Sequence, residues 1–179
     1  MYTFKETGHQ HLWDGKRMTG VTTVLGVIAK PALISWAANM AVDYIKTSKV
    51  WQLVPDTPRK IMIGDGELAQ LLEEARKAHT KKKEAAGDVG KLVHSACEDW
   101  IKNKTEPTLD EQGMKMFEHF RKWATDNKVK FLESEKHLYS ESLFLGGIVD
   151  IVAEIDGQNW ICDIKTGGVY PEAFYQMAA

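Results

Sequence analysis

Asp150, Asp163 and Lys165 are the residues of this 179-residue chain whose types and spacing best fit a chemical role. All three lie within residues 146–166, surrounded by Ile, Val and Trp. Partly buried charges are costly unless they pair or bind a metal ion. Two carboxylates can hold a divalent cation, and a neighbouring ammonium can stabilise charge that develops on a phosphate group. The alternative is a surface hairpin with a scattered ion pair, which the apolar neighbours disfavour.

A β-hairpin would bring these side chains together. Asp156-Gly157, between two apolar segments, predicts a two-residue type I′ turn. The register set by this turn places Asp150 opposite Asp163, with about 5 Å between their Cβ atoms. Side chains alternate between the faces of a strand, so Lys165 is expected on the same side as Asp163. Like charges at this separation destabilise a hairpin, and a bound cation would offset them.

A helix predicted over residues 87–104 adds two further candidates. Its apolar residues recur at spacings of three and four, and His94 and Glu98 lie one turn apart on the flank of that stripe. Gly87 and Gly90 lie on the same side and permit close approach of another segment. A single histidine beside an apolar stripe is commonly a hydrogen-bonded core residue; beside two acids it becomes a candidate metal ligand. Glu135 is another acidic candidate, but the sequence does not fix which face of its strand it occupies.

Four motifs together resemble the nuclease core of the PD-(D/E)xK superfamily, specifically its RecB-like exonuclease branch. They are Gly90-x-x-x-His94-x-x-x-Glu98, Gly147-Ile-Val-Asp150, Asp163-Ile-Lys165-Thr166 and Tyr175-Gln176. The segments Val21–Leu25 and Lys30–Leu33 with Trp36 resemble the opening of bacteriophage-type members. The resemblance implies an α/β (α+β) fold with a restriction-endonuclease-like core, in which helices flank a central mixed sheet and extra helices precede it.

The resemblance and the residue chemistry together assign a site. The catalytic residues are Asp150, Asp163, Lys165 and Glu98; the metal ligands are His94, Asp150, Asp163 and the carbonyl of Ile164; the DNA contacts are Lys81, Lys82, Lys83, Lys91, Thr166, Tyr175 and Gln176. Oxygen ligands favour one or two Mg²⁺ or Mn²⁺ ions, and the imidazole tilts the choice towards Mn²⁺. Glu98 is expected to bind through water or to orient a neighbour, and Lys165 to position water or stabilise developing charge.

The chain divides into two predicted regions within one globular domain. Residues 1–86 form an N-terminal helical and flap region with a basic helix, and residues 87–179 form an αβββα nuclease core that is truncated at its C-terminus. The further expected elements are a turn at Asp14-Gly15, a short helix capped by Thr22 or Thr23 and reaching Ile28, a helix from Pro31, a loop over 48–65, helices over 67–86 and 111–127, strands over 129–139 and from Leu143, and a helix from Pro171 through Gln176. Gly146-Gly147 predicts a bulge or the close approach of another backbone, such as a DNA strand.

The lysines between Lys77 and Lys83 have two interpretations. A run of charge is usually a solvated helix face, but a run just before a nuclease helix also suits tracking of a phosphate backbone. The formal net charge of the whole chain is −2, which excludes coating of nucleic acid by bulk electrostatics. Any contact with DNA must therefore be local.

Composition bounds the remaining classes. No signal peptide or apolar run of about 20 residues is present, so we expect no membrane partner and a location in the cytoplasm of a bacterial or phage-infected host cell. Cys97 and Cys162 are expected to be buried thiols, and two cysteines cannot supply the four ligands of the iron–sulfur cluster found in some RecB-like relatives.

The expected function is that of a metal-dependent deoxyribonuclease, an exonuclease working from single-stranded ends of DNA. The alternatives are a structure-selective or restriction-like endonuclease, and a catalytically silent DNA-binding module on the same fold. The resemblance also implies a recombination protein as a partner, which the sequence does not identify. The resembling proteins continue the last helix and add another strand, so the chain is either trimmed or an unusually short member.

Overall fold

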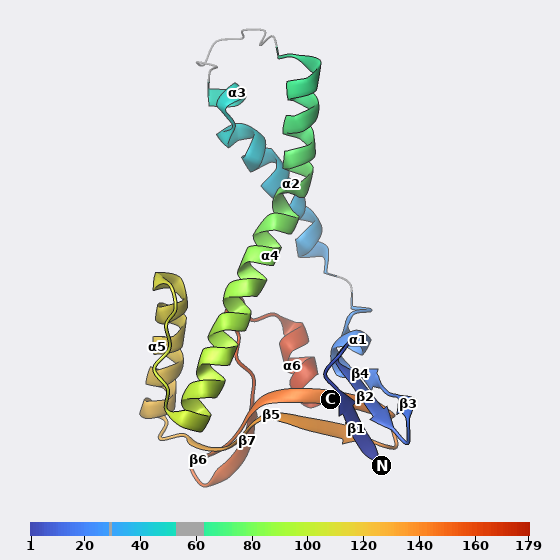
Figure 1. The fold of residues 1–179 in the computed structure, drawn as a ribbon, viewed down its shortest axis with the longest axis vertical. Helices are drawn as coiled ribbons and strands as arrows, with labels where there is room; N and C mark the ends of the chain where they lie inside the picture. The colour runs from blue at the N-terminus through green and yellow to red at the C-terminus, as the bar shows by residue number, and fades with distance from the viewer. Residues whose placement is uncertain (29, 53–62) are drawn as a thin grey trace. The chain divides into compact units, whose positions relative to one another are not determined.

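The computed structural model describes residues 1–28, 30–52 and 63–179, and it combines helices with antiparallel and parallel strand pairs (Figure 1). The elements are β1 (Tyr2–Lys5), β2 (Gln10–Trp13), β3 (Lys16–Arg17), β4 (Thr19–Gly20), α1 (Val21–Leu25), α2 (Pro31–Thr47), α3 (Lys49–Gln52), α4 (Asp65–Asn103), α5 (Glu111–Asp126), β5 (Lys130–Ser140), β6 (Leu145–Ile155), β7 (Gln158–Cys162) and α6 (Pro171–Ala178). The predicted mixed class of helices and strands is confirmed. The predicted loop over 48–65 is wrong at its start, where α3 forms, and most of the rest lies outside the described residues.

Strand β6 is the centre of the larger sheet. It pairs antiparallel with β5 along most of its length, antiparallel with β7 at its C-terminal end, and parallel with β4 at its N-terminal end. The β6–β7 register joins Ile155 to Gln158 and Ile151 to Cys162, as the turn at Asp156-Gly157 predicts. Both turn residues have positive φ, 51° and 75°, which is the requirement of a type I′ turn. The hairpin prediction is therefore confirmed.

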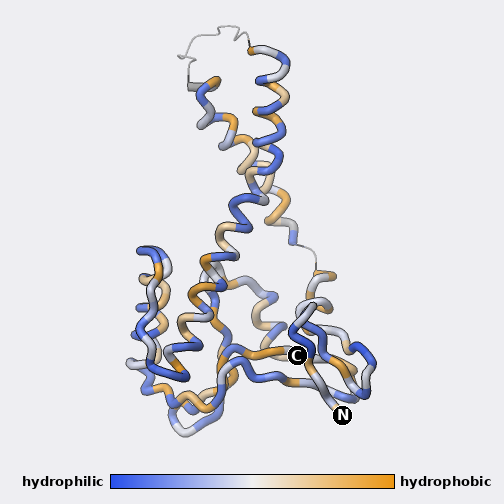
Figure 2. Tube along the Cα trace, in the orientation of Figure 1, coloured by the Kyte–Doolittle hydropathy of each residue, from blue (hydrophilic) through white to orange (hydrophobic). Residues whose placement is uncertain are grey.

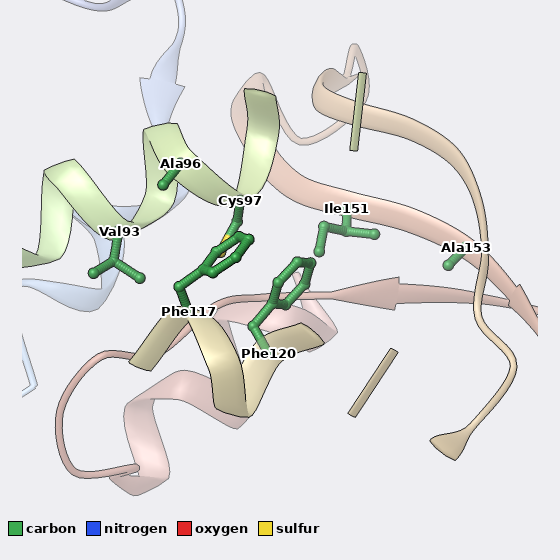
Figure 3. Packing of buried hydrophobic residues seen from close by; sticks show 7 residues of the cluster. All are labelled: Val93, Ala96, Cys97, Phe117, Phe120, Ile151 and Ala153. Carbon is green, nitrogen blue, oxygen red and sulfur yellow. The ribbon is translucent and has the colours of Figure 1, made fainter. Parts of the chain in front are cut away.

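Helices α4 and α5 cover one side of β6 and enclose the hydrophobic core (Figure 3). The buried residues are Val93, Ala96 and Cys97 of α4, Phe117 and Phe120 of α5, and Ile151 and Ala153 of β6. Trp100 adds edge-to-face contacts to Phe117, Phe120 and Phe131. The apolar stripe predicted over residues 87–104 is confirmed except at Leu92, which is 60% exposed. Cys97 is a buried free thiol as expected, whereas Cys162 is a half-buried one.

Helix α4 is one helix of 39 residues, so the prediction of two helices separated near Gly87 is wrong. A glycine inside a helix costs only about 1 kcal/mol relative to alanine. Good helix formers on either side, including Ala85, Ala86 and Leu92, are sufficient to carry the helix through. Gly87 and Gly90 therefore lie inside the helix and do not end it.

The contacts divide the chain into two compact units, residues 1–28 with 89–179, and residues 29–88. The sequence predicts a boundary after residue 86, with residues 1–28 in the N-terminal region. The structure groups them with the sheet, because β4 pairs with β6 and β2 contacts it. In the second unit Ala75 is buried and the rings of Trp36 and His79 meet edge to face. Apolar and polar residues interleave along α2 and α4 in Figure 2.

Strands β1, β2 and β3 form a small antiparallel meander with the predicted turn at Asp14-Gly15. The predicted cap of the following helix is wrong, since Gly20 is the N-cap residue of α1 and no side chain caps it. Gly20 is also the last residue of β4, so the chain passes from the sheet directly into the helix. α1 then ends at Leu25, before the predicted end at Ile28.

The bulge predicted at Gly146-Gly147 is also wrong, because the irregularity of the sheet lies in β5 between Phe131 and Glu133. The alternative prediction, the close approach of another backbone, is confirmed only in part, because the neighbour that comes close to Gly146 is the side chain of His11. A Cβ atom added to Gly146 would lie 2.4 Å from Cγ of His11. The N-terminal segment of the chain itself occupies this position, in place of the DNA strand that the pattern predicts as one neighbour. Within the described residues no helix is both long enough and apolar enough to cross a bilayer.

Candidate active site

Asp150 lies in the middle of β6, and its neighbours come from three other segments. Its Oδ2 accepts a hydrogen bond of 2.7 Å from the backbone N–H of Ile164. The ladder between β6 and β7 ends at Ile151 and Cys162, so Asp163 lies just beyond the last strand pair. The side chains of Asp150 and Asp163 are 16% and 13% exposed. They are also close enough to each other for their negative charges to interact unfavourably. The structure thus brings the two predicted acids together.

Lys165 forms an ion pair with Oδ2 of Asp163, so the two side chains lie on the same side as predicted. Strand alternation is not the cause, because β7 ends at Cys162 and neither residue lies in a strand. That oxygen is buried and accepts no hydrogen bond from the described residues. A buried carboxylate oxygen without hydrogen bonds is costly, and one ammonium beside it offsets only part of that cost. This oxygen is therefore available to a further cation or donor.

His94 reaches the same group of residues from α4. Its Nδ1 lies 3.5 Å from Oδ2 of Asp150. One turn earlier, Gly90 faces Thr166, whose Oγ1 would be only 3.0 Å from a Cβ atom at that position. The glycine therefore lets the segment after Lys165 lie against α4. Thr166, predicted to contact DNA, serves this packing.

Glu135 is a fifth side chain of the site, and the sequence alone does not fix its position. Ser134 pairs with Ile151 and Lys136 with Val149, which puts Glu135 opposite Asp150. Its φ is 51°, in the left-handed region that non-glycine residues seldom adopt inside a strand. Burial raises the pKa of Glu135, and the charges of Asp150 and Glu98 raise it further, while His94 and Lys102 oppose the shift.

The pKa of Asp150 is also raised. Burial is the main cause and Asp163 adds to it, whereas the hydrogen bond from Ile164, the imidazole of His94 and the ammonium of Lys165 act in the opposite direction. Two carboxyl groups with raised pKa values beside a third mark a site with an excess of negative charge. A divalent cation would relieve that excess.

The donors of this cluster fit a hard divalent ion by their chemistry. Glu135, Asp150 and Asp163 offer carboxylate oxygens and His94 an imidazole nitrogen, which suit Mg²⁺ or Mn²⁺. Among the described residues no three His, Cys, Asp or Glu side chains already converge closely enough to hold an ion. The fit rests on Oδ2 of Asp163, which has the ion pair with Lys165 but accepts no hydrogen bond from the described residues, and on the repulsion between Asp150 and Asp163.

The other predicted residues lie in different surroundings. Glu98 forms an ion pair with Lys102, one turn along α4, and its charge also acts on Glu135. Gln176 lines a cavity together with Asp163, whereas Tyr175 is 56% exposed on α6 and is not among the residues lining that cavity. Lys91 is exposed on α4. The backbone N–H of Ile164 donates a hydrogen bond to Asp150, and metal binding by the Ile164 carbonyl stays a prediction.

The basic run lies on the part of α4 that belongs to the second unit. Lys77 pairs with Glu73 and Lys81 with Glu74, so half of the run is neutralised locally. Lys82 and Lys83 are exposed, and neither has an acidic partner within ion-pair distance among the described residues. These two lysines are the part of the run that remains a candidate for phosphate contact.

Comparisons with protein-family models, curated proteins and solved structures found no match to this chain.

Proposed function

We propose that this chain is a metal-dependent deoxyribonuclease built on a restriction-endonuclease-like core. The observation that carries the proposal is the position of Asp150, flanked by Glu135 from β5 on one side and by Asp163 after β7 on the other. The elements follow in the order α4, α5, β5, β6, β7, α6, which is the αβββα order expected from the resemblance with one additional helix, α5, after α4. Lys165 beside Asp163 completes an acid, acid, lysine set.

The residues of the site suggest a division of roles. Asp150 and Asp163 would hold one or two Mg²⁺ or Mn²⁺ ions, with His94 and Glu135 as further ligands. Such ions, when bound, activate water and counter the charge of the phosphate group. The ammonium of Lys165 has no lone pair, so it would donate hydrogen bonds to the attacking water or to a phosphate oxygen. The Ile164 N–H fixes the carboxylate of Asp150 in its orientation.

Among the possible activities, we propose exonuclease action on DNA from single-stranded ends. An endonuclease, either structure-selective or restriction-like, would use the same residues. A catalytically silent DNA-binding module is the alternative outside the enzymes, and the complete set of acids and lysine disfavours it.

Incubation of end-labelled linear and covalently closed circular single-stranded DNA with the protein and Mn²⁺ tests the proposal. We expect linear DNA to shorten progressively and circular DNA to remain intact, with EDTA abolishing the reaction. Cleavage of the circle would instead indicate an endonuclease. A protein that binds neither Mg²⁺ nor Mn²⁺ and cuts neither substrate would be the silent module.

A further inference from the structure

A cavity of about 570 Å³ lies beside Asp163, one of the proposed catalytic acids, within the unit formed by residues 1–28 and 89–179. Asp163 and Gln176 lie on its wall, and Arg17, Thr22 and Thr23 of the N-terminal segment line it as well. The cavity therefore joins the site to a part of the chain to which the proposed function gives no role.

Two glycines of β6 allow the N-terminal segment to form this wall. Gly20 of β4 pairs with Gly146 in parallel register, and α1 follows immediately. Val21 then packs on Gly147, where an added Cβ atom would make an ordinary contact of 3.5 Å. Because β4 is hydrogen-bonded to β6, the wall is anchored in the same sheet as Asp150.

The charges in the cavity are arranged asymmetrically. Arg17 is exposed, and among the described residues it has no acidic partner within ion-pair distance. Thr22 and Thr23 are also exposed and bring hydroxyl donors. Asp163 is the one Asp or Glu side chain among the described residues that line the cavity. A cation and hydroxyl groups suit a phosphate, and guanidinium can bind one through two parallel hydrogen bonds.

We propose that this cavity receives one nucleotide unit of an unpaired DNA strand, with Arg17 on its phosphate, adjacent to the phosphodiester that is cut. Its volume falls in the range of about 300–1,000 Å³ typical of sites that enclose a small organic ligand. A base pair within a duplex does not enter such a space, so the strand must be single or locally opened. This inference rests on the proposed function and specifies its substrate class.

Binding of a fluorescent oligothymidylate in EDTA, at several salt concentrations, tests the role of Arg17 without cleavage. Arg17→Ala is compared with Lys16→Ala, which removes the neighbouring exposed cation of β3 that does not line the cavity. We expect Arg17→Ala to weaken binding about tenfold and to lower the salt slope by about 0.7, the contribution of one phosphate contact on a single strand. Lys16→Ala should leave both values close to wild type, and Arg17→Lys should recover part of the affinity.

Competition by thymidine 5′-monophosphate adds a positive readout. It should displace the oligonucleotide from the wild type more effectively than thymidine does, and Arg17→Ala should remove that difference. The inference would be overturned if Arg17→Ala and Lys16→Ala changed the oligonucleotide affinity equally. It would also be overturned if Arg17→Ala had wild-type thermal stability and wild-type affinity. Cleavage with Mn²⁺ is scored separately. If the wild type cuts DNA but its DNA binding does not depend on Arg17, only the proposed nucleotide site is refuted. If it binds DNA through Arg17 but never cuts, only the proposed nuclease activity is refuted.

Discussion

Glu135 and Asp150 face each other across β5 and β6, and burial raises the pKa of both. Two acids in this relationship compete for the same counter-charge. Their raised pKa values mean that the metal-free site retains protons to a higher pH than isolated carboxyl groups do. Metal binding should therefore strengthen as pH rises and should release protons.

If both acids serve one metal site, the losses of cleavage rate caused by replacing each acid should not multiply in the double variant. Glu135→Gln and Asp150→Asn should each reduce single-turnover cleavage strongly, and the double variant should lose little more than the worse of the two, because residues that act as a unit are non-additive. Glu141→Gln, an exposed acid in the loop after β5, is the control and should cleave at the wild-type rate. Losses that multiply independently would separate Glu135 from the metal site.

The residues of the site differ in how far the sequence could predict them. Asp150, Asp163 and Lys165 follow from a turn of known register, so their proximity was predictable. Glu135 was not, because the irregularity between Phe131 and Glu133 shifts the β5 register by one residue. No local sequence signal marks that shift, and without it Ser134 would face Asp150.

At the scale of elements, the core helix α5 and the β6–β7 hairpin were predictable because each follows one strong local pattern. The single helix α4 was not, since glycine propensity is a weak signal that flanking residues override. The neighbour of Gly146 was also beyond the sequence, because it depends on how a segment more than 130 residues earlier docks on β6.

Gly146 and Gly147 provide a test of that docking. Gly146→Ala should destabilise the protein by about 1–3 kcal/mol, as overpacking does, because its Cβ would lie 2.4 Å from His11. Gly147→Ala, the matched control on the same strand, makes only an ordinary contact with Val21 and should cost much less. Thermal unfolding of both variants decides this. Equal stabilities would show that His11 does not pack on β6 as described.

The same histidine makes the meander sensitive to pH. His11 is 7% exposed, its Nδ1 lies 2.7 Å from the Tyr2 hydroxyl, and it is surrounded by His9, His137 and the ring of Phe4. Burial, then His137 and His9, lower the pKa of His11 in the folded state. Its contribution to stability is therefore complete above the unfolded pKa of about 6.5 and is lost as pH falls through the lower folded value.

Thermal unfolding between pH 8 and pH 5 measures this effect. The wild type should lose stability on acidification more steeply than His11→Gln, while His119→Gln, which removes an exposed histidine on α5, should follow the wild type. Parallel pH profiles for the wild type and His11→Gln would contradict the buried neutral state of His11.

At the scale of the whole molecule, a net charge of −2 requires that any attraction to DNA come from local groups. In the basic run, Glu73 and Glu74 pair with Lys77 and Lys81. Lys82 and Lys83 are exposed and have no such ion pair among the described residues. Replacing both by alanine should weaken binding equally for different sequences and lower the salt slope by about 1.4 for single strands.

Lys115→Ala with Lys122→Ala is the control pair, since each of these lysines on α5 already pairs with an acid one turn away. Its salt slope should stay close to that of the wild type. If the double substitution Lys82→Ala with Lys83→Ala leaves the salt slope of DNA binding unchanged, the run is only a solvated helix face.

The central claim, a metal-dependent phosphodiesterase site, is tested most directly by calorimetric titration of Mn²⁺ into wild type, Asp163→Asn and Lys165→Ala, with single-turnover cleavage measured on the same preparations. Asp163→Asn should lose Mn²⁺ binding and cleavage together. Lys165→Ala should retain Mn²⁺, because an ammonium is no ligand, and should cut roughly 10²-fold or more slowly. A Lys165→Ala protein that loses the metal, or one that cuts at the wild-type rate, would contradict the account.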